Sequence, residues 1–196
     1  AEVQARRPRD LVIANAGIGG RDVLAPLGGE EPGVARAIIE INTLGVVNTI
    51  APLVEPFVSR GRGHFVIMGS LAGLQGLAQS PAYCASKAAV HVYGEGLRRQ
   101  LAPRGIAVTV VSPGFVETPM SRSLPFATPG LWTAERAAAH ILAGIARRKA
   151  EIVFPWHLRA VTRLVTALPA PLSDRIVAVG SSWLGAGRHR PPDRRS

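Results

Sequence analysis

The sequence contains little cysteine, little histidine and few aromatic residues, and each shortage excludes a class of protein. The single cysteine, Cys84, excludes an internal disulfide and a cysteine-based zinc site, and it favours a reducing compartment, the cytoplasm. The five histidines include no pair at the helical spacing common in metal sites, so we expect no metal. Aromatic residues are only 5% of the chain, too few for a surface that stacks nucleic-acid bases.

Long uncharged apolar runs are also missing. The longest stretch without Asp, Glu, Lys or Arg, residues 63–86, is rich in Gly, Ser and Pro, so we expect no transmembrane segment. The net charge of +10 is concentrated in arginines near both ends, which predicts solvated ends, with a basic, disordered tail over 185–196, rather than nucleic-acid binding. Residues 156–168 are amphipathic; packing against the core or a second subunit is favoured, and contact with a membrane surface stays an alternative.

Apolar runs and helical periodicity alternate along the chain. Short runs predict strands at 11–15 (buried on both faces), 64–69, 106–112 and 152–154. Periodic segments predict helices at 31–59, at 82–102, after a Thr133 cap, and at 157–184 with breaks at Pro169 and Pro171. This alternation predicts an α/β fold, a Rossmann-like doubly wound parallel sheet, in one domain over 1–184.

In such sheets, ligands bind beyond the carboxyl ends of the strands. Three glycine-containing or polar segments follow the predicted strands: Asn15-Ala16-Gly17, Gly69-Ser70 and Ser112-Pro113-Gly114. We therefore expect these three segments to converge on one rim of the sheet.

Tyr83 and Lys87 are the residues that most strongly indicate chemistry. Their spacing places a phenol and an ammonium one turn apart on a helix face, and a nearby cation favours the phenolate form of tyrosine. Only two of the 23 basic residues are lysines, and Lys87 is the sole one before Lys149. A chain that otherwise uses arginine therefore has lysine at this position, which indicates lysine chemistry.

Other polar residues are open to two interpretations when taken singly. Ser70, at a strand end, is either a turn residue or a hydroxyl that donates to a substrate oxygen. Asn42 interrupts an apolar helix face and is either a structural hydrogen-bonding group or part of a polar relay. For Cys84 and His91, we favour helix packing over chemistry.

Taken together, these motifs resemble the classical short-chain dehydrogenase/reductase family. The resemblance covers about residues 10–154, in the family's order and spacing. The matching pieces are Asn15-Ala16-Gly17, Asn42-Thr43-Leu44-Gly45, Ser70, Tyr83-x-x-x-Lys87 and Pro113-Gly114-x-x-x-Thr118.

The resemblance implies an NAD(P)-dependent oxidoreductase that interconverts a secondary alcohol and a ketone, with NADP slightly favoured. It implies that Tyr83 is the general acid/base, that Lys87 lowers the tyrosine pKa and binds the nicotinamide ribose, that Ser70 orients the substrate oxygen, and that Asn42 holds a relay water. It also implies cofactor contacts from a further set of residues: Asn15, Ala16, Gly17, Pro113, Gly114, Val116 and Thr118.

One departure from the family pattern is large. The family begins with a strand, a Gly-rich turn of the T-G-x-x-x-G-x-G type and a helix that receives the pyrophosphate, and this sequence contains no such turn. The chain also starts at Ala1 without methionine. We therefore expect the fold to lack the first three strands, roughly 75–90 residues.

The predicted substrate is a fairly apolar small alcohol or ketone. It would lie beside the segments 71–80 and 115–132, near Ser70, Leu77, Phe115 and Phe126, although these apolar residues also suit loop packing. The resemblance further implies a homodimer or tetramer. The alternative function is a non-catalytic fragment or pseudoenzyme that acts as an interaction module.

Overall fold

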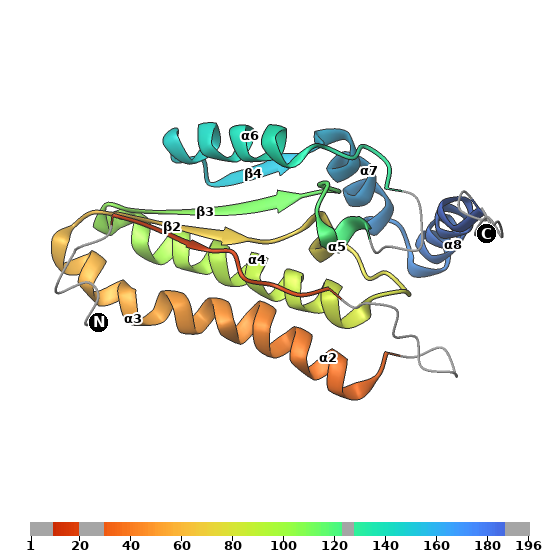
Figure 1. Cartoon of the computed structure of the whole chain (residues 1–196), viewed down its shortest axis with the longest axis horizontal. Helices are drawn as coiled ribbons and strands as arrows, with labels where there is room; N and C mark the ends of the chain where they lie inside the picture. The colour runs from red at the N-terminus through yellow and green to blue at the C-terminus, as the bar shows by residue number, and fades with distance from the viewer. Residues whose placement is uncertain (1–9, 20–29, 123–127, 187–196) are drawn as a thin grey trace, which may run out of the picture.

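The structure, a computed structural model, describes residues 10–19, 30–122 and 128–186, with side chains to residue 180. Its centre is a four-stranded parallel sheet in the order β1-β2-β3-β4 (Figure 1). All four strands lie within two residues of their predicted positions: β1 Leu11–Ala14, β2 Gly63–Met68, β3 Ile106–Pro113 and β4 Glu151–Phe154.

Helices cover both faces of this sheet, as a doubly wound fold requires. A long helical stretch and α4 lie on one face, and α6 lies on the other (Figure 1). The long stretch consists of α2 Pro32–Ile39, a π-helical turn η1 Glu40–Leu44 and α3 Gly45–Arg60, and the other two are α4 Pro81–Leu101 and α6 Ala134–Ala146. Thr133 caps α6 as expected, since its hydroxyl accepts from the Arg136 N–H at 3.3 Å. The predicted α/β Rossmann-like fold is thus confirmed.

The chain ends in two helices, α7 Trp156–Thr166 and α8 Ala170–Ala186, towards the carboxyl ends of the strands (Figure 1). The break between them falls at Pro169 as predicted, but Pro171 does not break the chain again, because it lies in the first turn of α8, where proline is tolerated. Three short helices complete the described elements: η2 Leu71–Leu74, η3 Ala102–Arg104 and α5 Pro119–Arg122. The tail predicted over 185–196 falls almost wholly outside the described residues.

Aromatic stacking fixes the helical stretch to the sheet. The ring of Phe57, on α3, stacks on that of Phe65, on β2, with centroids 4.5 Å apart, and both side chains are fully buried. Gly63 has to be glycine, because a Cβ there would lie 2.0 Å from the Phe57 ring. This core holds the helix that carries Asn42 against the strand that leads to Ser70.

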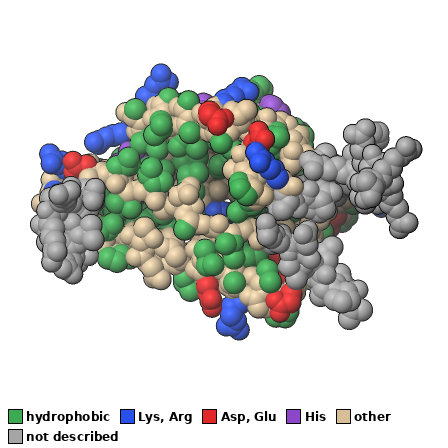
Figure 2. All heavy atoms as spheres, viewed as in Figure 1, with side chains coloured by type: hydrophobic (Ala, Val, Ile, Leu, Met, Phe, Trp, Pro, Cys, Tyr) green, Lys and Arg blue, Asp and Glu red, His purple; other side chains and the backbone are tan. Residues whose placement is uncertain are grey.

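Strand β1 differs from its prediction in burial. Leu11 and Ile13 are 42% and 44% exposed, so the expectation of a strand buried on both faces is wrong. Val12 and Ala14 pack in the core beside α3, whereas Leu11 and Ile13 point to the opposite face, which no described element covers at this edge strand (Figure 1). In the same view, hydrophobic side chains lie exposed over the sheet and its flanking helices (Figure 2). An edge strand of this kind favours association with another chain or segment.

The helical stretch Pro32–Arg60 is long and apolar enough to cross a membrane by length and composition alone, with a mean hydropathy of 1.5. Core helices of soluble proteins satisfy the same criterion, so the match is weak evidence. In this fold its inner face packs in the core, where Ile38, Ile50 and Phe57 are fully buried.

Candidate active site

Helix α4 presents three polar side chains on one face, at successive four-residue steps: Tyr83, Lys87 and His91. The helix approaches the end of β2 closely. A Cβ on Gly73 would lie only 2.6 Å from the Lys87 carbonyl carbon, so glycine is what allows η2 to lie against α4 at this depth. Ser70 caps η2, its hydroxyl accepting from the Ala72 N–H at 3.1 Å. The contact therefore brings Ser70 to the same face as Tyr83.

Lys87 is a buried cation without an acidic partner among the described contacts. Its side chain is 5% exposed, and Nζ donates to the Met68 carbonyl at the end of β2 over 2.9 Å. Burial lowers the pKa of Lys87 from 10.5 to about 8, because desolvation disfavours the charged form. One backbone acceptor leaves the ammonium able to donate further hydrogen bonds into the site.

Tyr83 is half-buried beside this lysine, with Lys87 Nζ 5.8 Å from the centre of its ring. Burial raises the pKa of the Tyr83 phenol, and a side-chain hydrogen bond with Ser70 acts in the opposite direction. Desolvation is the largest influence on this pKa, and the Lys87 ammonium donates to the Met68 carbonyl. The phenol is consequently held in its protonated form at neutral pH. A lowering of the Tyr83 pKa by Lys87 stays a prediction.

Asn42 connects the β1 end to α4. Its side chain is fully buried; Oδ1 accepts from the Ile18 N–H at 2.8 Å, and Nδ2 donates to the Ile18 carbonyl at 2.9 Å. Nδ2 also lies 3.1 Å from Ser86 Oγ, which donates to the Tyr83 carbonyl at 2.7 Å. The Asn42 amide thus has a structural role, one of the two that its sequence position left open, and it joins the segment after β1 to α4.

The π-helical turn explains how Asn42 reaches this position. Residues Glu40–Leu44 take one extra residue per turn, and such turns occur frequently at functional sites. Gly17 completes the contact, since a Cβ there would lie 3.2 Å from Asn42 Oδ1 and 3.4 Å from Lys87 Nζ. The Gly17 backbone, the Asn42 amide and the Lys87 ammonium therefore lie close together.

Replacing Asn42 with Ala should destabilise the protein by roughly 1–3 kcal/mol, because the half-buried N–H and C=O of Ile18 would lose their partner. Urea denaturation followed by circular dichroism measures this change. The exposed Asn48, six residues along the same helical stretch, provides the control: Asn48→Ala should change the free energy of unfolding by less than about 0.5 kcal/mol. Equal effects of the two substitutions would contradict the role assigned to Asn42.

The segment after β3 also reaches the rim. The Gly114 N–H donates to the Phe154 carbonyl at 2.7 Å, and Val116 bridges to Trp132, which holds Pro113–Thr118 against the end of β4. The Thr118 hydroxyl accepts from the Ser121 N–H at 3.3 Å and caps α5, so its role here is structural. A contact between the Thr118 hydroxyl and a cofactor stays a prediction.

The remaining predicted residues lie in different surroundings. Asn15 and Ala16 follow β1 and are exposed, because no described element covers that edge. Leu77 and Phe115 are half-buried near the rim, whereas Phe126 lies outside the described residues. The structure thus brings Asn42, Ser70, Tyr83 and Lys87 together and leaves the β1 end open.

Two polar contacts of this site were missed in the sequence. Ser86 links Asn42 to the backbone of Tyr83, and His91 Nε2 lies 2.6 Å from Ser112 Oγ on β3. The second contact joins α4 to β3, in keeping with packing rather than chemistry for His91. The repeated four-residue step from Tyr83 through Lys87 to His91 is the signal that could have indicated it.

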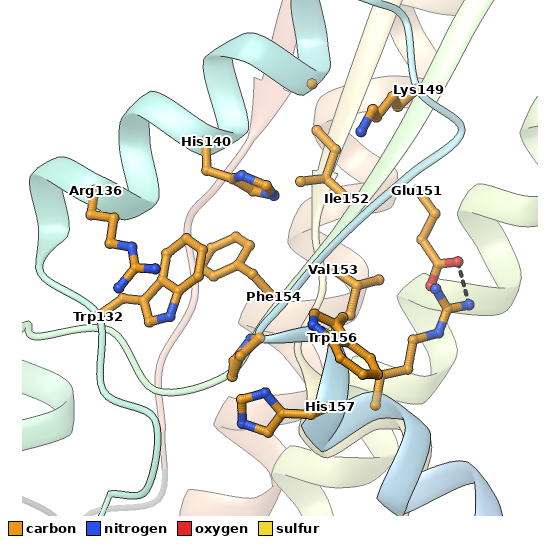
Figure 3. Close-up of a pocket in the computed structure, with 13 residues that line it drawn as sticks. Trp132, Arg136, His140, Lys149, Glu151, Ile152, Val153, Phe154, Trp156 and His157 are labelled. Carbon is orange, nitrogen blue, oxygen red and sulfur yellow. Dashed lines mark hydrogen bonds and ion pairs between the residues drawn. The ribbon is translucent and has the colours of Figure 1, made fainter.

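A cavity among the described residues lies elsewhere. It has a volume of about 640 Å³ and lies over the outer edge of β4. Figure 3 shows Trp132, Arg136 and His140 on one side of it and Trp156 and His157 on the other. None of the predicted site residues lines this cavity, so it is separate from the candidate active site.

Comparisons with known proteins agree with this arrangement. A family model described as short chain dehydrogenase matches residues 2–127. An uncharacterized oxidoreductase of Myxococcus xanthus is 41% identical over 165 residues, covering 84% of this chain and 64% of that protein. The 3-oxoacyl-acyl-carrier-protein reductase FabG of Escherichia coli is 34% identical over 115 residues, 59% of this chain and 46% of FabG.

A solved structure shows the same fold. A short chain dehydrogenase from Burkholderia cenocepacia, in complex with NADP, superposes with a TM-score of 0.74 at 27% identity, over 89% of this chain and 74% of that one. The chain spans less than two thirds of the length of the M. xanthus relative. With a family model over more than half its residues, the chain belongs to the short chain dehydrogenase family.

Proposed function

We propose that the chain is the catalytic part of an NAD(P)-dependent oxidoreductase that interconverts a secondary alcohol and a ketone on a fairly apolar substrate. The observation that carries this proposal is the meeting of Tyr83, Ser70 and the buried Lys87 at the carboxyl ends of the strands. A protonated phenol, a neighbouring hydroxyl and an ammonium are the groups that proton transfer to a carbonyl oxygen needs.

The residues present fit one end of a nicotinamide cofactor. The Lys87 ammonium has a single described acceptor and lies beside Tyr83, so it is suited to hold ribose hydroxyls there. Pro113, Gly114, Val116 and Thr118 would face the nicotinamide, and Asn15, Ala16 and Gly17 the adenosine side. When bound, the cofactor supplies the hydride.

The chain's own residues would transfer the proton to the substrate oxygen. In reduction, the Tyr83 phenol donates its proton to the substrate oxygen as negative charge develops there. The Ser70 hydroxyl donates a hydrogen bond to the same oxygen and keeps it within reach of the phenol. Lys87 stabilises the phenolate that remains, and a water near Asn42 would return the proton from solvent.

No described residue distinguishes NAD from NADP. We favour NADP, because the Burkholderia cenocepacia relative was solved in complex with it. We further propose a homodimer or tetramer in the cytoplasm, in keeping with the family, and a small-molecule carbonyl or alcohol as the substrate. A non-catalytic interaction module is the second candidate, favoured by the open edge of β1 and its exposed Leu11 and Ile13.

Titration of NADPH and NADH into the 196-residue chain, followed by nucleotide fluorescence, separates these candidates. Because the sequence has no Gly-rich turn to bind the pyrophosphate, we expect binding weaker than about micromolar, with Lys87→Met weakening it further. Submicromolar binding would contradict the expectation that this chain has no pyrophosphate site. Binding that is undetectable and unaffected by any site substitution would favour the interaction module.

A further inference from the structure

Helices α7 and α8 each expose a stripe of large apolar side chains. On α7, Trp156, Val161 and Leu164 are 75%, 58% and 69% exposed. On α8, Leu172, Ile176 and Val179 are 48%, 42% and 59% exposed and recur at steps of four and three residues, which places them on one face of the helix. We call these six residues the apolar stripes.

Helix α7 is anchored to the fold, so its exposed stripe does not belong to an unpacked segment. On the opposite side of α7, Val165 is buried and Leu158 half-buried, and the Arg159 guanidinium pairs with the Glu151 carboxylate at 2.5 Å. Helix α7 contacts η2 and β4, and α8 contacts α7. The inner face of α7 is therefore fixed to the fold and its outer face is apolar, whereas the described side chains of α8 are exposed or at most half-buried.

The charge beside the stripes is strongly positive. Helical spacing places the exposed Arg163 next to Trp156 on the wheel of α7, and Arg175 borders the stripe of α8 beside Val179. From residue 155 to the end, the sequence contains seven arginines and two aspartates, four of the arginines following α8. Apolar side chains bordered by arginines are typical of helices that lie in a membrane interface.

We propose that α7 and α8 dock the protein on an anionic lipid bilayer, with the apolar stripes inserted at the level of the headgroups. Charge distinguishes this partner from a second copy of the chain, because two such basic faces would repel each other. The apolar stripes distinguish it from nucleic acid, which binds mainly through phosphate contacts. This proposal does not depend on the redox function.

The location has a consequence for the active site. Both helices lie towards the carboxyl ends of the strands, where Ser70 and Tyr83 are found, and α7 contacts η2, which Ser70 caps (Figure 1). Docking would hold this rim close to the bilayer. An apolar substrate dissolved in the membrane would then reach Tyr83 without crossing bulk water.

Vesicle flotation with the full chain tests the proposal. Phosphatidylcholine vesicles containing phosphatidylglycerol should carry the protein to the top of the gradient, and added salt should weaken binding. The double substitution Leu164→Asp with Val179→Asp should weaken binding by at least about tenfold, since each inserted aliphatic side chain supplies roughly one tenfold step. Arg163→Gln with Arg175→Gln should remove most of the preference for phosphatidylglycerol.

A matched control uses exposed apolar residues outside the stripes. Leu142, on α6, and Val92, on α4, are 59% and 69% exposed, so Leu142→Asp with Val92→Asp adds the same charge at similar exposure. This control should float like the unchanged protein, and circular dichroism should show the same helix content for all variants. Equal losses in both double variants, or no flotation of the unchanged chain, would overturn the proposal. So would sedimentation showing that the Leu164 and Val179 substitutions split a dimer without affecting flotation.

Discussion

Replacing Tyr83 with Phe should lower the rate of carbonyl reduction by roughly 10²–10⁴-fold, the usual contribution of a positioned general acid. The change removes one oxygen and keeps the ring, so the packing of α4 should persist. Burial holds the pKa of the Tyr83 phenol above its ordinary value, so the acid form is present at neutral pH. We therefore expect the reduction rate to stay flat through neutral pH and to fall at alkaline pH as the phenol ionises. The measurement is NADPH-dependent reduction of apolar ketones by the protein that carries this chain.

The chain offers a matched control for this substitution. Tyr93 is the only other tyrosine, lies ten residues further along α4, and is also partly buried. Tyr93→Phe should leave the rate within about twofold, because its ring packs against the core, away from the rim. If Tyr83→Phe retained the full rate, or both substitutions lowered it equally, Tyr83 would not be the proton donor.

Replacing Lys87 with Met should raise the free energy of unfolding at neutral pH while it abolishes cofactor-dependent activity. Burial lowers the pKa of Lys87 to about 8, which corresponds to a destabilisation of roughly 3 kcal/mol in the charged form. Methionine fills a similar volume without a charge and loses only the hydrogen bond to the Met68 carbonyl. A gain of about 1–3 kcal/mol is therefore expected, at the expense of function.

The pH dependence of the free energy of unfolding tests whether the buried charge of Lys87 is the cause of this destabilisation. Between about pH 8 and 10.5 the unfolded chain keeps a proton on Lys87 that the folded chain releases, so wild-type stability should rise with pH across this window. The gain in free energy of unfolding of Lys87→Met over the wild type should therefore shrink over the same pH range. Lys149, exposed and the only other lysine, gives the control: Lys149→Met should leave the pH dependence unchanged. If the difference in free energy of unfolding between wild type and Lys87→Met were constant with pH, the buried charge of Lys87 would not be its cause.

Much of this site could be predicted from sequence because its residues sit at strand ends and helical steps. Buried parallel strands are short continuous apolar runs, so the positions of β2, β3 and β4 follow from composition, and Ser70 follows from β2. The step from Tyr83 to Lys87 specifies one helix face without any tertiary information. The motifs that indicate the family are local in the same way.

The parts that could not be predicted depend on distances between segments. The role of Asn42 needs the Ile18 backbone, 24 residues away, and the contact between His91 and Ser112 spans 21 residues. The direction of the Tyr83 pKa depends on the depth of burial against the effect of Lys87, which spacing alone does not contain. The exposure of β1 depends on which elements cover its two faces, and a run of apolar residues in the sequence does not indicate those elements.

The central claim is that Tyr83, Ser70 and Lys87 serve proton transfer to a carbonyl oxygen beside a nicotinamide. Its most direct test is isotope transfer from NADPH deuterated at the reactive nicotinamide carbon, using the protein that carries this chain and an apolar ketone. The account predicts deuterium on the carbinol carbon of the product with the wild type, and none above background in the same time with Tyr83→Phe. No transfer by the wild type, or equal transfer by Tyr83→Phe, would contradict it.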